Sequence, residues 1–542
     1  MKFQAILKAT AVAAALLGGT AITTAYAADV PAGTTLAAEQ VFKYRVLDNI
    51  RALDPQLAED VDTAYVVNQL FDGLYIEDAN GNPVPGGAES YDVNADNTVY
   101  TFHLRDAKWS NGDPVLASDY VFGWQRAVDP ALASTYAYYL GLVNVVNADD
   151  IVAGKLPLTD LGIKALDDKT LEVTLKAPTP WFVKTLAHST LFAAPQKVVE
   201  KFGADWTKPE NIVSNGAYIL TENSPGERVV LKRNPNYWDN AKTVIEEIQF
   251  LTINDENQGL TRWRAGEVDQ TDVPAGQYPA LEAELPNETY SVPQFCTYYV
   301  SVNMTDSAPD ALKSKEVRQA LNLAIDRDII VNAVLQGGQT PAYSFTNPNT
   351  SGFVMPSIPA ASMTQAERDA KAKELFAAAG YGPDNPLTLD YIYNTSEAHK
   401  AIIVAVSQMW KEKLGVSVNI SDMEFAILSD RRHTQDYELA RNAWCGDYNE
   451  ASTFLSLHDS KSEQNDQGWA NAEVDKLLAD AKLASDPNPM YSKIEEIAAE
   501  EIPIMPIYFY SKVFMQRPTV KGWPYNNVEQ IWYAKDMYIT AE

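Results

Sequence analysis

The stretch LTLDYIYNTSEAHKAIIVAVSQMWKEKLGVSVNI, residues 387–420, contains a strand, a helix and a second strand in direct succession. Residues 387–394 are rich in β-branched and aromatic side chains, which is typical of strands. Ser396 is a suitable N-cap for the helix that follows, and Gly415 is a suitable stop. Segment 416–420 is then the second strand. This spacing predicts a βαβ unit with a parallel sheet and a right-handed crossover, and therefore an α/β fold.

The flanking segments extend this interpretation in both directions. Residues 364–380 open with Thr364 and Glu367 in capping-box spacing, so we expect a further helix there. Residues 314–338 predict two helices broken near Asp326. Before residue 300 the pattern changes to short strands separated by turns and proline-rich loops, at 97–105, 169–176, 227–234 and 245–253. The mixture predicts α/β lobes with a strand-rich insertion.

Length and charge limit the domain count and the partners. With 542 residues the chain is too long for one hydrophobic core, so two or three domains are expected. The formal net charge of −29 repels nucleic acid and anionic membrane surfaces, so we expect neither as a partner. It does not show that the ligand is cationic, because strong acidity also serves solubility.

The first 27 residues have the three parts of a secretory signal. Lys2 and Lys8 precede and enter an apolar run that ends in the small-x-small sequence Ala25-Tyr26-Ala27. We predict cleavage before Ala28, and no cysteine stands near this site to carry a lipid anchor. No later apolar run approaches the roughly 18 to 20 residues that a membrane span needs. An exported, unanchored protein is expected.

Both cysteines, Cys296 and Cys445, lie in the mature region. An even number of cysteines in an exported protein favours a disulfide, and two buried free thiols are the alternative. Cys445 stands in the sequence LARNAWCGDYNE, residues 439–450, where an aromatic-rich strand leads directly into Asp447. A carboxylate there could be a surface turn, a catalytic group or the counter-charge of a cationic ligand.

Local enzyme motifs are absent from the chain. There is no G-x-S-x-G elbow, no phosphate-binding loop, no H-E-x-x-H and no C-x-x-C. The five histidines, at 103, 188, 399, 433 and 458, are dispersed and show no sequence-local zinc cluster. We expect no enzyme, although an exported glycoside hydrolase with two carboxylates far apart in sequence stays open as an alternative.

A resemblance covers essentially the whole mature chain. The segment AESYDVNADNTVYTFHLRDAKWSNGDPVLASDYVFGWQRAVDP, residues 88–130, resembles the signature region of the extracytoplasmic peptide-binding proteins of solute-binding protein family 5, which serve ABC importers. The likeness continues in SNGAYIL, VVLKRNPNYWDNAKTVIEEI, ALNLAIDRDIIV, KLGVSVNI and ARNAWCGDYNE. It implies two α/β lobes of the class II (cluster C) binding-protein type with an extra α+β domain. Lobe I would be 28–71, 196–295 and 512–542, the extra domain 72–195, and lobe II 296–511.

The resemblance also implies a function. Such a protein captures short peptides of about two to five residues between its lobes, largely independently of side chains, and delivers them to a membrane permease driven by an ATPase. It is a periplasmic monomer and needs no cofactor. To accept many sequences it must recognise what all peptides share, namely an ammonium, a backbone and a carboxylate. An enclosed ammonium needs an opposite charge, and exposed strands can pair with any peptide backbone.

Residue roles carry over from the family's motifs. Asp447 matches the ammonium-binding aspartate, and Trp444, Cys445 and Gly446 would lie beside the peptide backbone. The family also has a disulfide where Cys296 and Cys445 stand, which would brace this wall.

Other positions match the lining of the family's site. These are Tyr136, Glu59, Tyr510 and Asn394. The alternatives are an ordinary packed aromatic for Tyr136, a solvated loop acid for Glu59 and a structural role for Tyr510 and Asn394.

The carboxylate end of the peptide is where this chain departs from the family. His399 matches a histidine that helps bind the C-terminus of longer peptides, and Arg441 an arginine used for shorter ones. Arg432 also lies close, and a salt bridge within the lobe is the alternative role for either arginine. The departures from the family's residues are Leu335 for a lysine, Phe425 for a pocket tryptophan and Ser301 for a glutamate.

The loss of the lysine suggests a hypothesis about ligand length. Because a cation is missing, we predict a preference shifted from tetrapeptides towards tripeptides through Arg441. A modified peptide such as murein tripeptide is the alternative ligand. A dipeptide and a metal chelate are further options, and Asp447 argues against the chelate because an ammonium counter-charge has no purpose there.

Overall fold

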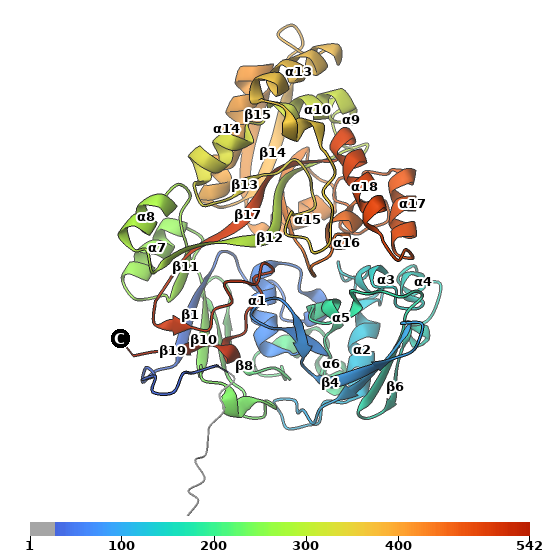
Figure 1. Cartoon of the computed structure of the whole chain (residues 1–542), viewed down its shortest axis with the longest axis vertical. Coiled ribbons are helices and arrows are strands. Elements are labelled where there is room, and N and C mark those ends of the chain that lie inside the picture. Colours follow the sequence, from blue (N-terminus) through green and yellow to red (C-terminus); the bar gives the residue numbers. More distant parts are fainter. Residues whose placement is uncertain (1–27, 542) are drawn as a thin grey trace, which may run out of the picture.

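The computed structural model describes residues 28–541, which form two groups of elements joined by two long strands (Figure 1). The predicted signal segment 1–27 lies outside these residues. The strands of the main sheet follow one another in the order β15 (Ser417–Met423), β14 (Thr388–Asn394), β16 (Leu439–Cys445), β12 (Thr289–Val302), β17 (Ile504–Gln516), β11 (Gln270–Asp272), β1 (Val41–Val46), β10 (Glu247–Thr252), β9 (Arg228–Arg233) and β8 (Tyr218–Ser224), with β13 (Thr340–Pro341) beside β17.

The predicted βαβ unit is confirmed. Strands β14 and β15 pair in parallel over their full lengths, and α14 (Glu397–Leu414) connects them. The Ser396 side chain accepts a hydrogen bond from the backbone N–H of His399, as an N-cap does. Gly415 ends the helix at φ +75°, a left-handed conformation that glycine adopts without steric cost. One face of α14 packs into the core through Ile402, Ile403, Val406 and Trp410.

The other predicted helices of this region are also present. In α13 (Gln365–Ala378), Thr364 and Glu367 make the reciprocal bonds of a capping box. In α10 (Lys315–Ala324), one face is fully buried through Val317, Ala320, Leu321 and Ala324. The break near Asp326 is followed by α11 (Arg327–Ile329), which continues as a π-helical turn at Ile330–Leu335.

Strands β12 and β17 run through both halves of the molecule. Thr289–Pro293 pairs with Ser511–Met515 at one end, and Thr297–Ser301 pairs with Ile504–Phe509 at the other. The register shifts between Pro293 and Thr297, so the pairing is irregular where the chain passes from one half to the other. The predicted lobe boundaries at 295/296 and 511/512 fall at this point and stay predictions.

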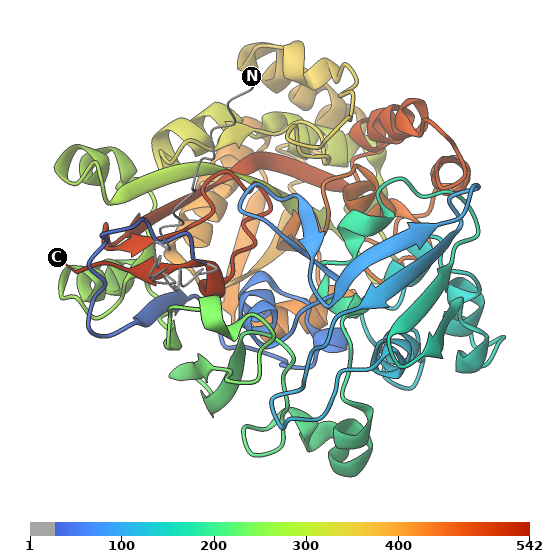
Figure 2. The same cartoon turned by 60° about the horizontal axis from the view of Figure 1, so that its bottom comes forward.

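The lower half in Figure 1 contains the strand-rich part of the chain. Strand β1 lies between β10 and β11, parallel to both. A separate antiparallel sheet has the order β4 (Ala88–Val93), β5 (Val99–Leu104), β7 (Thr170–Thr174) and β6 (Ile163–Asp167), and α2 (Ala117–Ala127) lies beside β6. Figure 2 shows this sheet at the side of the molecule. One continuous core extends from it into the main sheet, from Phe102 through Trp124 to Phe250.

Shorter elements complete the chain. The helices are α1 (Val61–Leu70), α3 (Tyr139–Leu142), α4 (Ala148–Val152), α5 (Phe182–Thr185), α6 (Gln196–Phe202), α7 (Glu256–Arg264), α8 (Tyr278–Glu284), α9 (Asp310–Lys313), α12 (Pro359–Ser362), α15 (Phe425–His433), α16 (Ser452–Leu455), α17 (Ala472–Ala481) and α18 (Asn488–Glu501). Two small strand pairs are β2 (Tyr75–Glu77) with β3 (Pro83–Pro85) and β18 (Val520–Lys521) with β19 (Tyr538–Ile539). Within residues 28–541, no helix combines the length and apolar character that crossing a membrane requires.

Candidate functional site

A cavity of about 460 Å³ lies between the two halves, and both contribute to its walls. It brings together every ligand-binding residue that the sequence predicted, although these residues are spread over nearly the whole chain. They are Glu59, Tyr136, Asn394, His399, Phe425, Arg432, Arg441, Trp444, Cys445, Gly446, Asp447 and Tyr510. Leu335 lines the cavity as well, whereas Ser301 is fully buried and bonded to Asn442 and Gln467.

Asp447 is a buried carboxylate in the wall of this cavity. Only 7% of its side chain is exposed. It accepts a hydrogen bond from the Tyr136 hydroxyl at 3.1 Å and a longer one from Thr453 at 3.5 Å. Burial raises the pKa of Asp447 to about 7, and these two bonds only partly oppose the shift. The carboxylate is therefore costly to ionise until a cation reaches it.

The nearest basic side chain does not supply that cation. His188 Nε2 lies 3.6 Å from Asp447 Oδ1, but burial lowers the pKa of His188 to about 3. The imidazole is thus neutral at physiological pH. Among residues 28–541, Asp447 has no lysine or arginine within 4.0 Å. The position is suited to an incoming ammonium group.

Strand β16 lines the cavity from Arg441 to Cys445 and leads to Asp447. One edge pairs with β12 along its whole length, from Leu439 to Cys445. The other edge pairs with β14 only at Leu439 and Ala440, so 441–445 has no strand partner there within the described chain. An unpaired strand edge can accept an extended peptide by backbone hydrogen bonds, independently of its side chains.

The predicted disulfide is confirmed and supports this wall. Cys296 and Cys445 are directly paired across β12 and β16 and are bonded to each other. Gly446 follows, and a Cβ at this position would lie 2.1 Å from the Phe295 ring. A side chain at 446 would therefore displace the strand that carries Asp447, which explains glycine at this position.

Arg441 lies at the other end of the unpaired edge, among tyrosines. Its Nη2 donates to the Tyr510 hydroxyl at 2.9 Å, and its guanidinium stands 5.3 Å from the Tyr298 ring centroid. Its Nε is buried without a hydrogen-bond partner in the described chain. Of the arginines that line the cavity, Arg45 and Arg432 pair with acids, and Arg441 does not.

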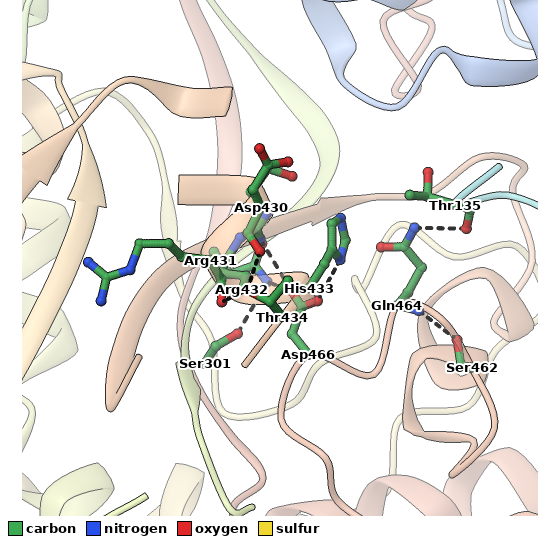
Figure 3. A network of polar contacts seen from close by, with 12 residues as sticks. Thr135, Ser301, Asp430, Arg431, Arg432, His433, Thr434, Ser462, Gln464 and Asp466 are labelled. Atoms are coloured by element: carbon green, nitrogen blue, oxygen red, sulfur yellow. Dashed lines mark hydrogen bonds and ion pairs between the residues drawn. The ribbon is translucent and has the colours of Figure 1, made fainter. Parts of the chain in front are cut away.

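Arg432 belongs instead to a polar network on α15 (Figure 3). It contacts the Asn442 side chain and lies 3.6 Å from Asp466. His433, next in sequence, is held between Asp466 at 2.9 Å and Glu59 at 2.6 Å. The salt-bridge role considered for Arg432 is thus the one that this geometry favours.

Glu59 connects the two halves of the molecule. It precedes α1, and it accepts hydrogen bonds from Ser429 and His433 of α15. Burial works against the charge of His433, but Asp466 and Glu59 raise its pKa to about 9. Despite burial, the bond from His433 lowers the pKa of Glu59 to about 2. The pair is charged at neutral pH and holds the two halves together in the arrangement seen here.

This pair predicts that closure without ligand depends on pH. Because the pKa of His433 is raised, its contribution is complete below about pH 6.5 and is lost as the pH rises through 9. Only the bond to Glu59 contributes to closure, since Asp466 belongs to the same half as His433. This bond contributes about 1–2 kcal/mol to the free energy of closure. We expect the radius of gyration of ligand-free protein, measured by X-ray scattering, to be larger at pH 9.5 than at pH 6.5.

Two variants separate this contact from a general effect of pH. His433→Gln should remove most of the difference between the two pH values. His103→Gln changes an exposed histidine paired with Asp92 and should behave like the parent protein. Equal scattering curves for the parent at both pH values would contradict the prediction.

Residues that the sequence analysis did not select also line the cavity. His188, Glu256 and Glu529 are among them. Burial and the neighbouring Glu77 raise the pKa of Glu529 well above its usual value. Nothing local in the sequence marks these three, because each reaches the cavity only through the packing of distant segments.

The two groups of elements, the long strands β12 and β17 that join them and the cavity between them define a two-lobed solute-binding protein. Residues 82–466 match the bacterial extracellular solute-binding proteins, family 5. The periplasmic oligopeptide-binding protein OppA of Salmonella typhimurium is 44% identical over 98% of this chain and 99% of its own. The chain therefore belongs to family 5 of the bacterial extracellular solute-binding proteins, and the expected family and fold class are confirmed.

Solved structures agree with this assignment. The murein tripeptide-binding protein MppA of Escherichia coli superposes with a TM-score of 0.92 at 40% identity, covering 94% of this chain and 100% of that one. OppA of Haemophilus influenzae in complex with the peptide RPPGFSPFR superposes with a TM-score of 0.90 at 37% identity, covering 93% of this chain and 100% of that one. The unliganded open form of MppA superposes with a TM-score of only 0.67, covering 94% of this chain and 99% of that one. The lobes here are thus arranged as in the first of these structures and unlike the open form.

Proposed function

We propose that this chain is a periplasmic binding protein that captures short peptides and delivers them to an ABC importer. One observation carries the proposal. A buried carboxylate without a cation, Asp447, and a guanidinium without a carboxylate, Arg441, stand at opposite ends of an unpaired strand edge. A short peptide has the complementary ammonium, carboxylate and extended backbone.

The relatives support the same class of ligand and the same location. OppA proteins are named for oligopeptide binding and for the periplasm, and one has been solved with a peptide. We infer that residues 1–27 are a cleaved signal and that the mature protein is an unanchored monomer acting with a permease and an ATPase. We also infer that it catalyses no reaction, and assays for turnover of peptides and glycosides test this directly.

Murein tripeptide is the second candidate ligand. It is favoured by the superposition on MppA and by the changed cavity positions Leu335 and Phe425. This peptide also presents a free amine and carboxylates, so Asp447 and Arg441 suit it equally. The two candidates differ in whether plain peptides bind.

The test is calorimetry with ligand-stripped protein and alanine peptides of two to five residues. We expect the tripeptide to bind at least several-fold more tightly than the tetrapeptide, because Arg441 is the unpaired arginine of the cavity and Leu335 offers no second cation. Equal affinities for the two lengths would contradict this preference. Binding of murein tripeptide but of no plain peptide would place the second candidate first.

A further inference from the structure

One wall of the cavity carries three buried polar atoms that lack a hydrogen-bond partner within the described chain. They are Glu256 Oε2, Asn394 Oδ1 and His399 Nδ1. The three residues are only 6%, 2% and 8% exposed, and all line the cavity. Buried polar atoms are normally hydrogen-bonded, so three on one wall point to a ligand group.

Ser396 holds this wall together across the two lobes. Its hydroxyl donates to Glu256 Oε1 at 2.8 Å and accepts from the His399 backbone N–H at 3.4 Å. Glu256 begins α7 in lobe I, whereas Asn394 ends β14 and His399 lies in the first turn of α14, both in lobe II. The wall is therefore complete only when the lobes meet.

Two of the three unpartnered atoms of the wall are hydrogen-bond acceptors. Glu256 and Asn394 present a carboxylate oxygen and an amide oxygen, which accept hydrogen bonds. Burial, assisted by Arg441, lowers the pKa of His399 well below its usual value, so the imidazole carries no positive charge. The Glu256 carboxylate is linked to the His399 backbone through Ser396, and without a positive charge on the imidazole this wall favours a cation with several N–H donors.

The wall adjoins the arginine that we assign to the peptide carboxylate. The Tyr298 ring lies between them, with its centroid 5.6 Å from the His399 ring and 5.3 Å from the Arg441 guanidinium. A peptide whose carboxylate rests on Arg441 therefore has its last side chain within reach of the wall. This arrangement differs from the expected role of His399 in binding a carboxylate.

We propose that Glu256, Asn394 and His399 form a subsite for the ammonium or guanidinium group of a basic residue at the C-terminal end of a short peptide. The subsite rests on the proposed peptide-binding function and narrows its substrate class to peptides that end in lysine or arginine. With this subsite the cavity binds three charged groups of the peptide: its ammonium, its carboxylate and its last side chain.

The experiment compares four tripeptides by calorimetry: Ala-Ala-Lys, Ala-Ala-norleucine, Ala-Ala-Glu and Ala-Ala-Ala. Norleucine keeps the length of the apolar lysine stem but lacks the ammonium. We expect Ala-Ala-Lys to bind at least tenfold more tightly than Ala-Ala-norleucine, and Ala-Ala-Glu to bind most weakly. In Glu256→Gln the affinity for Ala-Ala-Lys should exceed that for Ala-Ala-norleucine by less than threefold. Glu267→Gln, which changes an exposed acid paired with Arg262, should keep the ratio of the parent protein.

Each other outcome has a defined meaning. Equal binding of the lysine and norleucine peptides to the parent protein, or a preference for glutamate, overturns the subsite without any variant. If the preference for the lysine peptide over the norleucine peptide is unchanged in Glu256→Gln, Glu256 does not belong to the subsite. If Ala-Ala-Ala and all other plain peptides fail to bind, the proposed function itself fails. Circular dichroism of both variants establishes that they are folded.

Discussion

Replacing Asp447 by asparagine is expected to weaken the binding of a free tripeptide by about 2–5 kcal/mol, which corresponds to roughly 30- to 5,000-fold in Kd. The substitution keeps the size and the hydrogen bond to Tyr136 but removes the charge opposite the peptide's ammonium. The ammonium would then be enclosed without a counter-charge. Calorimetry on ligand-stripped protein measures the loss.

Acetylation of the peptide provides the matching change on the ligand. An N-acetyl tripeptide should bind weakly to the parent protein. Asp447→Asn should lower its affinity little further, because the two changes remove the same interaction. Glu267→Gln is the control variant, since this exposed acid is paired with Arg262 and does not line the cavity. If Asp447→Asn bound free and acetylated peptides as the parent does, Asp447 would be structural.

The dependence of binding on pH follows from the same carboxylate. In the ligand-free protein the pKa of Asp447 is raised to about 7, and an ammonium ligand requires the ionised form. Below pH 7 binding must first remove a proton, so affinity should fall towards tenfold per pH unit. Asp447→Asn should abolish this slope.

Replacing both cysteines by serine is the second change with a large expected effect. The bond joins residues separated by 149 positions, and chain-entropy models assign about 5 kcal/mol to a loop of this size. Measured losses for native disulfides are typically about 2–5 kcal/mol, so we expect a loss of that order in the free energy of unfolding. Urea denaturation with and without reductant measures it.

The control for this prediction lies in the reductant. It should lower the midpoint of the parent protein to that of the double variant and leave the variant unchanged. Binding of a tripeptide by the folded variant should weaken less than tenfold, because β12 and β16 remain paired from Thr297 and Trp444 to Val302 and Leu439. An unchanged midpoint in the variant would show that the disulfide does not stabilise the fold.

Local signals predicted much of the architecture. The capping box of Thr364 and Glu367, the cap at Ser396 and the stop at Gly415 each depend on residues within one or two helical turns. Such signals are complete in the sequence, so the βαβ unit could be derived directly. The family resemblance then supplied the site residues, and the cavity gathers all of them.

Contacts across the cavity could not be predicted in this way. Ser396 and Glu256 are 140 residues apart, and they meet only because α7 of one lobe faces β14 and α14 of the other. No sequence feature near Glu256 indicates a buried carboxylate with a hydrogen-bond partner on only one of its two oxygens. For the same reason the sequence does not predict that Glu59 and His433 pair between the lobes, although the sequence analysis names each residue separately.

The amino-acid pattern is sufficient to assign an α/β protein with a helix-linked parallel strand pair and an acidic, disulfide-compatible composition. The tertiary structure alone decided which charges are left for a ligand. Arg432 and Arg441 are nine positions apart and look alike in sequence, yet Arg432 pairs with Asp466 and Arg441 lies among tyrosines. Charge pairing depends on separations of a few ångströms between distant segments, and only the packed lobes set those distances.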